Sequence, residues 1–415
     1  MAQQVRAKAQ VTRNLQCGMS IDIQPQPRHD RHSNRRITKD FLGGTMESAL
    51  AMAELAELIA AINTDADDPR WNFDSDLDRA SYREFAMHCL HHSLQFWLEA
   101  DPLRPRWNRW FMPNKKLLGD NPDTVYYGTV IDPTKSYRIR GNIENACYTS
   151  FTVEIGTAGG TMSQKLGHTL NDTEFEVDAA GNYELIASPQ GSGPNWLRLD
   201  PEAGSITTRH YFEWTRCAAL DPSLHIPLLI EPLDDPGPPP VPDDAAVAAN
   251  IRRAITFLRS VTADWGHNPM PPGAIPWVSA EPNAFTNPPA HDGNLGIGYA
   301  ATDNIYRSAR WKLAPDEALE IRGSWPRCTF ANIVLFNNHM QTPNYDRRLV
   351  SLNRVQTEVS DDGSWRMILA HSDPGLPNWL DTRGLEHGTM FWRFLIPTEP
   401  LTQLETRVVK FSDLS

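Results

Sequence analysis

Residues 121–127 read Asn-Pro-Asp-Thr-Val-Tyr-Tyr, and residues 303–306 read Asp-Asn-Ile-Tyr, which repeats the Asp-Thr-Val-Tyr core of the first stretch. Further matches follow in the same order: Ile139-Arg140-Gly141 with Ile321-Arg322-Gly323, Tyr148 with Phe330, Gly181 with Gly363, Asn195-Trp196-Leu197 with Asn378-Trp379-Leu380, and Arg209 with Arg393. The offset grows only from 180 to 184 residues along the chain. A period this long indicates two copies of one domain rather than a solenoid of short repeats.

Both copies consist of short alternating runs rich in β-branched and aromatic residues, such as Tyr148 to Ile155, separated by Gly, Pro, Asn and Asp about every ten residues. This texture is typical of antiparallel β-sheets. We therefore predict a mainly β fold with added helices. Its core is two tandem, similar antiparallel β-sandwich domains of jelly-roll-like type.

Apolar residues at helical spacing predict one helix from Met46 and a second from about Arg79 to Glu99, capped by Asp76 or Asp78. A third helix is predicted after a proline-stiffened linker. The predicted organisation is a disordered basic leader (1–45), a helical N-terminal segment (46–105), a first β domain (106–230), a proline-rich linker with a helix (231–296) and a second β domain (297–415). A basic docking arm is the alternative for the leader, which need not belong to the working protein.

The composition narrows the class of partner. The chain of 415 residues carries 39 Lys and Arg against 51 Asp and Glu, a formal charge of −12. An acidic chain without a basic patch is a poor candidate for binding nucleic acid or anionic membranes. It contains no apolar run long enough to span a membrane. Five widely spaced cysteines fit reduced thiols in the cytoplasm. We expect a small-molecule ligand or substrate, and a homo-oligomer is a further expectation.

The duplication also sorts residues by role. Positions kept in both copies are expected to serve architecture. Arg-Gly at 140–141 suits a turn with positive φ, and Asn-Trp at 195–196 suits a side-chain-capped turn whose indole plugs one end of the sandwich. Polar residues present in only one copy are the better candidates for function.

The stretch 121–127, followed by Tyr-Arg-Ile-Arg-Gly at 137–141, resembles the bacterial family built on the domain of unknown function 1214. The stretch Pro-Asn-Trp-Leu-Asp-Thr at 377–382, before Arg393, is similar to the most recognisable part of that family. The resemblance covers about 120 to 400 and implies two β-sandwich-like domains with helical additions. It implies no agreed activity, so no catalytic residue is carried over.

Metal and cofactor motifs are weak. His88 and His92 share a helix face but have no obvious third ligand nearby. The aspartates at 74, 76 and 78 mimic a calcium loop, but Arg79 stands where that loop needs glycine. The glycines at 293, 296 and 298 do not match the dinucleotide fingerprint, and no nucleophile elbow or P-loop is present. We therefore expect neither a metal nor a cofactor.

The remaining candidates suit general acid–base chemistry. We assign catalytic roles to Asp123 as base, Tyr126 as hydroxyl donor, His339 as acid/base and Arg209 as anion clamp. The expected substrate-binding residues are Asn121, Tyr127, Asn338, His371 and Asp373. Because Asp123 and Tyr126 recur in the second copy, a structural role for that pair is the stronger alternative.

The predicted function is that of a hydrolase or lyase acting on a small polar or carbohydrate-like substrate, in a cleft where the copies meet. The alternatives are a non-catalytic carbohydrate- or lipid-binding module and a purely structural oligomer.

Overall fold

The computed structural model describes residues 46–71, 73, 75–264, 275–286 and 299–414. The predicted leader (1–45) and the glycines at 293, 296 and 298 lie outside the described residues.

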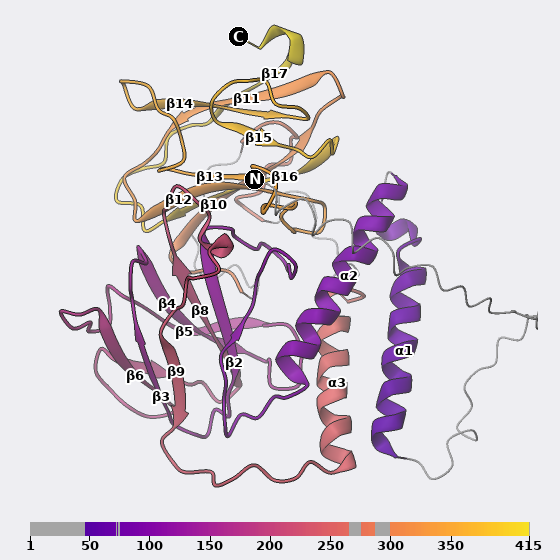
Figure 1. The fold of residues 1–415 in the computed structure, drawn as a ribbon, viewed down its shortest axis with the longest axis vertical. Helices are drawn as coiled ribbons and strands as arrows, with labels where there is room; N and C mark the ends of the chain where they lie inside the picture. Colours follow the sequence, from indigo (N-terminus) through magenta and orange to yellow (C-terminus); the bar gives the residue numbers. More distant parts are fainter. Residues whose placement is uncertain (1–45, 72, 74, 265–274, 287–298, 415) are drawn as a thin grey trace, which may run out of the picture. The chain divides into compact units, whose positions relative to one another are not determined.

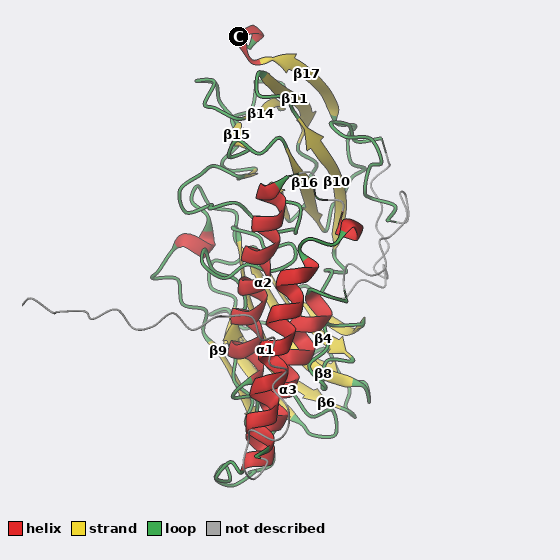
Figure 2. Cartoon of the chain, turned by 90° about the vertical axis from the view of Figure 1, so that its right-hand side faces the viewer, coloured by secondary structure: helices red, strands yellow, loops and turns green. Residues whose placement is uncertain are grey.

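Three α-helices in the described part of the chain pack beside one β-sheet (Figures 1 and 2). They are α1 (Glu47–Asp65), α2 (Asp76–Trp97) and α3 (Asp244–Val261), and three short 3-10 helices are η2 (Pro69–Trp71), η3 (Ala218–Leu220) and η5 (Phe411–Asp413). Asp243 caps α3 through the backbone N–H of Ala246. The neighbouring Asp244 accepts hydrogen bonds from the backbone N–H groups of Glu47 and Ser48, so it ties the start of α1 to α3.

The start of α2 differs from the prediction. Ser75 is the N-cap: its side chain accepts from the backbone N–H of Asp78, and the Asp78 carboxylate accepts from the backbone N–H of Ser75. This reciprocal pair is a capping box, in which the residue three positions into the helix supports the cap. Asp78 therefore helps to start the helix, but the expected Asp76 cap is wrong and the helix begins three residues earlier.

The strands fall into two sets. The first set is β1 (Asn108–Arg109), β2 (Thr124–Val130), β3 (Tyr137–Asn142), β4 (Tyr148–Ile155), β5 (Lys165–Asn171), β6 (Asn182–Ser188), β7 (Trp196–Arg198), β8 (Ala203–Tyr211) and β9 (Leu228–Pro232). The second set is β10 (Asn304–Lys312), β11 (Glu317–Ser324), β12 (Phe330–Phe336), β13 (Ser351–Asn353), β14 (Ser364–Ala370), β15 (Trp379–Asp381), β16 (His387–Leu395) and β17 (Glu405–Lys410).

The two sets have the same topology. The first set forms sheets β1-β2-β8-β4-β5 and β7-β6-β3-β9, and the second forms β10-β16-β12-β13 and β15-β14-β11-β17. Apart from the short edge strand β1, each strand has a counterpart in the same place. Even the one parallel pair recurs, as β6 with β7 and β14 with β15. In each set the two sheets share one apolar core, so the predicted pair of similar β-sandwiches with added helices is confirmed.

The repeated Asn-Trp pairs build the same turn twice. The Asn195 side chain donates to the backbone of Glu184 and accepts from that of Glu176, and Asn378 makes the equivalent bonds. The indole N–H groups of Trp196 and Trp379 donate to carbonyls at equivalent places in β6 and β14. A side-chain-capped turn with an indole at its side was expected here.

The repeated Arg-Gly pairs do not form turns. Gly141 and Gly323 lie inside β3 and β11, directly opposite Tyr183 and Trp365. A Cβ at Gly141 would come within 2.2 Å of the Tyr183 hydroxyl, and one at Gly323 within 2.9 Å of the Trp365 ring. These glycines make room for an aromatic ring on the neighbouring strand, so the expected positive φ is wrong.

Candidate functional site at the junction of the two copies

Each copy pairs one tyrosine with one arginine on adjacent strands. In the first copy Tyr126 of β2 lies directly opposite Arg209 of β8, and in the second Tyr306 of β10 lies opposite Arg393 of β16. All four side chains are buried or nearly so. With Tyr211, which both guanidinium groups influence electrostatically, they form what we call the junction cluster: Tyr126, Tyr211, Tyr306, Arg209 and Arg393.

Arg209 has a full set of protein partners. One Nη atom donates to the Thr152 hydroxyl at 2.8 Å, and the other donates to the backbone carbonyl of Tyr299 at 3.0 Å and lies 3.9 Å from Glu154. Glu154 is completely buried and accepts a hydrogen bond from Ser163 at 2.6 Å. Burial raises the pKa of Glu154, and the Arg209 charge opposes that rise. The charge of Arg209 therefore has a counterion within the protein.

Arg393 differs in this respect. One Nη atom donates to the Gly119 carbonyl at 2.6 Å, and the face of the guanidinium lies over the rings of Phe391 and Phe336, at 4.7 and 5.7 Å from their centroids. The other Nη atom is buried and has no hydrogen-bond partner among the described residues. No ion pair of the described residues includes Arg393. The buried carboxyl group of Asp120 interacts electrostatically with both Arg393 and Lys116, so Arg393 shares this carboxyl group with a second cation.

The three tyrosines carry neutral hydroxyl groups. Burial raises the pKa of Tyr126, Tyr211 and Tyr306, although both guanidinium groups oppose that rise. The Tyr211 hydroxyl accepts from the Asn304 side chain at 3.0 Å, and that of Tyr306 accepts from the backbone of Ala301 at 2.9 Å. A hydroxyl that accepts in this way keeps its own proton available for donation.

Asp123, the expected base, lies in a buried network that joins the two copies. Its carboxylate accepts hydrogen bonds from the side-chain amides of Asn332 and Asn353, both in the second copy. Asn121, expected to bind substrate, also accepts from Asn332, at 2.8 Å. Burial raises the pKa of Asp123 to about 6. The equivalent Asp303 accepts from Tyr148 and Asn171 of the first copy.

Tyr127 lies apart from the junction cluster. Successive strand residues point to opposite faces of a sheet, so its side chain leaves β2 on the face away from Tyr126. There its ring packs edge-on against His210.

His339, the expected acid/base, is surrounded by aromatic rings. Its ring centroid lies 5.4 to 5.6 Å from those of Phe73, Tyr82 and Phe85. Burial lowers the pKa of His339 to about 4, so the imidazole is neutral at physiological pH. The neighbouring Asn338 donates to the Asp78 carboxylate at 2.9 Å. These contacts attach the loop after β12 to α2.

His371 lies at a surface hollow of about 500 Å³ lined by Pro315, Asp316, His371, Ser372, Lys410, Phe411 and Ser412. Its ring nitrogens contact the Thr382 hydroxyl and the Ala314 carbonyl. The Asp373 carboxylate accepts from the backbone of Gly375 within its own turn. None of the contacts of His371 or Asp373 between described residues reaches the junction cluster.

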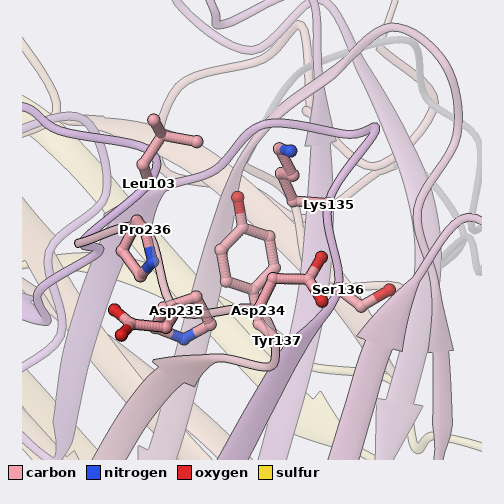
Figure 3. A pocket seen from close by; sticks show the side chains of 8 residues that line it. Leu103, Lys135, Ser136, Tyr137, Asp234, Asp235 and Pro236 are labelled. Carbon is pink, nitrogen blue, oxygen red and sulfur yellow. The ribbon is translucent and has the colours of Figure 1, made fainter.

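A second hollow, of about 100 Å³, lies between the linker and β3 (Figure 3) and is lined by Leu103, Lys135, Ser136, Tyr137, Pro232, Asp234, Asp235 and Pro236. The Tyr137 hydroxyl already donates to the Pro102 carbonyl and accepts from the backbone of Asp132. The tyrosine hydroxyl of this hollow is therefore engaged in holding the fold.

Among the described residues, no group of three or more His, Cys, Asp or Glu side chains is placed to hold a metal ion. No helix in the described ranges combines the length and apolar character needed to cross a bilayer.

Comparison with solved structures supports the fold. No family model matches the sequence, and neither does any curated protein. Among solved structures, an uncharacterized protein from Burkholderia cenocepacia is similar, with 26% identity and a TM-score of 0.75 over 89% of this chain and 99% of that one. A protein from Vibrio parahaemolyticus is 13% identical, with a TM-score of 0.46 over 79% of this chain and 98% of that one.

The structure thus brings together Tyr126 and Arg209 from the expected catalytic set. It adds Arg393 and Tyr306, and also Glu154, an acidic residue that the second copy lacks at the equivalent position. Arg393 and Tyr306 were visible in the sequence as the repeats of Arg209 and Tyr126. The sequence does not show that these repeated positions of the two copies face one another in the fold.

Proposed function

We propose that the protein is a small-molecule enzyme, of hydrolase or lyase type, whose anionic substrate binds at the junction cluster. The unpartnered Nη atom of Arg393 carries this proposal. A buried charged donor without an acceptor costs folding free energy, and a bound anion removes that cost. Glu154 neutralises Arg209, and Asp120 is shared between Arg393 and Lys116, so one positive charge remains for a ligand.

The tyrosines supply the chemistry. Their raised pKa values keep the hydroxyls of Tyr126 and Tyr306 protonated, beside a fixed guanidinium. Such donors stabilise the oxyanion that forms in acyl transfer and the enolate that forms when a proton leaves the carbon next to a carboxylate. Glu154, whose pKa burial raises, is the carboxyl group suited to accept that proton. The hydrogen bonds of Asp123 and the aromatic packing of His339 favour structural roles for both.

The proposal is tested by ligand binding. Acetate, succinate, inorganic phosphate and glucose are added to the purified full-length protein, and the melting temperature and the heat of binding are measured. We expect at least one anion to bind and raise the melting temperature, and Arg393→Gln to abolish its binding. Arg322→Gln, which removes an exposed arginine of β11, is the matched control for lost charge. Binding of glucose alone, or unchanged anion binding by a folded Arg393→Gln, overturns the proposal.

Catalysis needs its own test. Monoethyl succinate and β-hydroxy derivatives of the anions that bind, all of which keep a negative charge, are offered as substrates to detect hydrolysis and elimination. Tyr126→Phe keeps the ring and removes one oxyanion donor, so we expect turnover to fall about 100-fold. A melting temperature close to that of the wild type confirms that the variant is folded. Unchanged turnover in that variant contradicts the role of Tyr126.

We further propose that the enzyme works in the cytoplasm, where the described cysteines, none of which is disulfide-bonded, would stay reduced. The matching topology of the two copies supports the resemblance to the domain of unknown function 1214, and we propose membership of that family. We also propose a homo-oligomer, which analytical ultracentrifugation of the full chain tests.

A further inference from the structure

The surroundings of Arg393 point to the chemical class of the ligand. The guanidinium lies against an aromatic cluster of Trp277, Tyr306, Phe336 and Phe391. Ring centroids in this cluster are 5.3 to 5.6 Å apart. Because the rings of Phe391 and Phe336 cover the face of the guanidinium, an anion has to approach the free Nη atom in the plane of the group.

The charge of the site limits the charge of the ligand. Arg209, Arg393 and Lys116 bring three positive charges, and the buried carboxyl groups of Glu154 and Asp120 bring two negative ones. A single negative charge on the ligand therefore completes the balance. A second carboxylate would be desolvated without a cationic partner among the described residues, and burying an unpaired charge is costly.

The side chains packed around the guanidinium of Arg393 are apolar. Phe336 and Val334 of β12 pack with Phe391 of β16 and with Trp277 in one buried apolar group. Trp277 and Tyr306 each keep 8% of their surface exposed, whereas Val334 and Phe336 are completely buried. Aromatic rings give contact area to an apolar body and few hydrogen bonds to a polyol.

We propose that the ligand is a monocarboxylate with an aryl or branched-alkyl body, held by its carboxylate at Arg393 and by its body against the aromatic cluster. This inference rests on the proposed function and narrows its substrate class. It departs from the carbohydrate-like substrate expected from the sequence.

The test compares phenylacetate with acetate, succinate and inorganic phosphate by calorimetry on the full-length protein. We expect the dissociation constant of phenylacetate to be at least about tenfold lower than that of acetate, because its ring adds apolar contacts with the aromatic cluster. Succinate and phosphate should bind more weakly than phenylacetate. Trp277→Leu should reduce the preference for phenylacetate over acetate, whereas Trp214→Leu, on a partly buried tryptophan of another cluster, should leave it unchanged.

The outcomes separate the two proposals. If acetate, succinate and phenylacetate bind equally and Arg393→Gln abolishes all three, the substrate class is wrong and the proposed function stands. If no anion binds to the wild-type protein, both are wrong. If phenylacetate binds tightly but Trp277→Leu keeps the full preference, the aromatic cluster is not the surface that holds the ligand, and the inference fails.

Discussion

The Asp123 carboxylate accepts a hydrogen bond from the Asn353 side-chain amide at 3.2 Å, across the junction between the two copies. The equivalent residues make the same bond with the two copies exchanged: the Asn171 side chain of the first copy donates to the Asp303 carboxylate of the second at 3.1 Å. Between them lies an apolar group of equivalent residues, Tyr148 with Phe330 and Tyr211 with Leu395. The same type of hydrogen bond is thus made twice across the junction. Because its acceptor is a carboxylate, the stability of the junction should depend on pH.

Asp123→Asn should remove part of the pH dependence of stability. Burial raises the pKa of Asp123 from 3.8 to about 6, so the folded protein holds this proton more tightly than the unfolded chain. The free energy of unfolding therefore falls as the pH rises from about 4 to 6, by about 3 kcal/mol from this group. Asparagine does not titrate, so the variant should lack this component in urea denaturation at pH 4 and pH 7. Parallel curves for the two proteins would contradict the buried placement of Asp123.

His339→Leu should show a pH effect of opposite sign. Burial lowers the pKa of His339 from 6.5 to about 4, so the unfolded chain takes up a proton first as the pH falls. The wild-type protein then loses about 2 kcal/mol between pH 7 and pH 5 from this residue. Leucine keeps an apolar side chain among the rings and does not titrate. The melting temperature of the variant relative to the wild type should therefore rise on acidification. If the difference stays constant, the imidazole is not held neutral by burial.

Gly141→Ala should destabilise the first sandwich. The new methyl group would lie 2.2 Å from the Tyr183 hydroxyl and 2.7 Å from the Pro227 carbonyl oxygen, which belongs to the backbone and cannot rotate away. Overpacking of this kind costs about 1–3 kcal/mol. Gly159→Ala is the matched control, because nothing lies within 4 Å of its added Cβ. Equal unfolding free energies for the two variants, measured by urea denaturation, would show that Tyr183 does not pack on Gly141.

Asn195→Ala and Asn378→Ala should both weaken the fold, because each removes a side chain that bridges two backbone segments. The loss of such bonds, which lie at or near the surface, costs about 0.5–1.5 kcal/mol each. Asn378 also has a φ of 56°, a conformation that costs alanine about 1 kcal/mol more. We therefore expect the larger drop in melting temperature for Asn378→Ala. An effect in only one copy would contradict the equivalence of the two turns.

The sequence predicted the architecture better than the site. The ordered matches between the copies predicted two similar sandwiches, because strand order and turn positions follow directly from local patterns. Gly141 shows the limit of such patterns, since a glycine that admits an aromatic ring and a glycine that permits a turn are indistinguishable in one sequence. Only the pairing with Tyr183 separates them.

The site was harder because it depends on which faces of the two copies meet. Residues unique to one copy, such as His339 and His371, were expected to mark function. In the structure they pack on α2 and at a surface hollow instead. The repeated Arg209 and Arg393 have different neighbours, because Phe336 takes the place in the second copy that Glu154 has in the first. The sequence shows this exchange of residue type, but only the fold shows that Glu154 lies beside Arg209.

The reciprocal Asp–Asn contacts have a consequence for the history of the chain. A contact that is made twice in opposite directions is the hallmark of an isologous interface, in which one surface is complementary to itself. A single ancestral copy with these residues could have formed a homodimer before its gene was doubled and fused. Once the two copies are joined in one chain, each copy can acquire substitutions independently of the other. Phe330 in place of Tyr148 and an unpaired guanidinium in only one half are the asymmetries that a symmetric dimer could not have acquired.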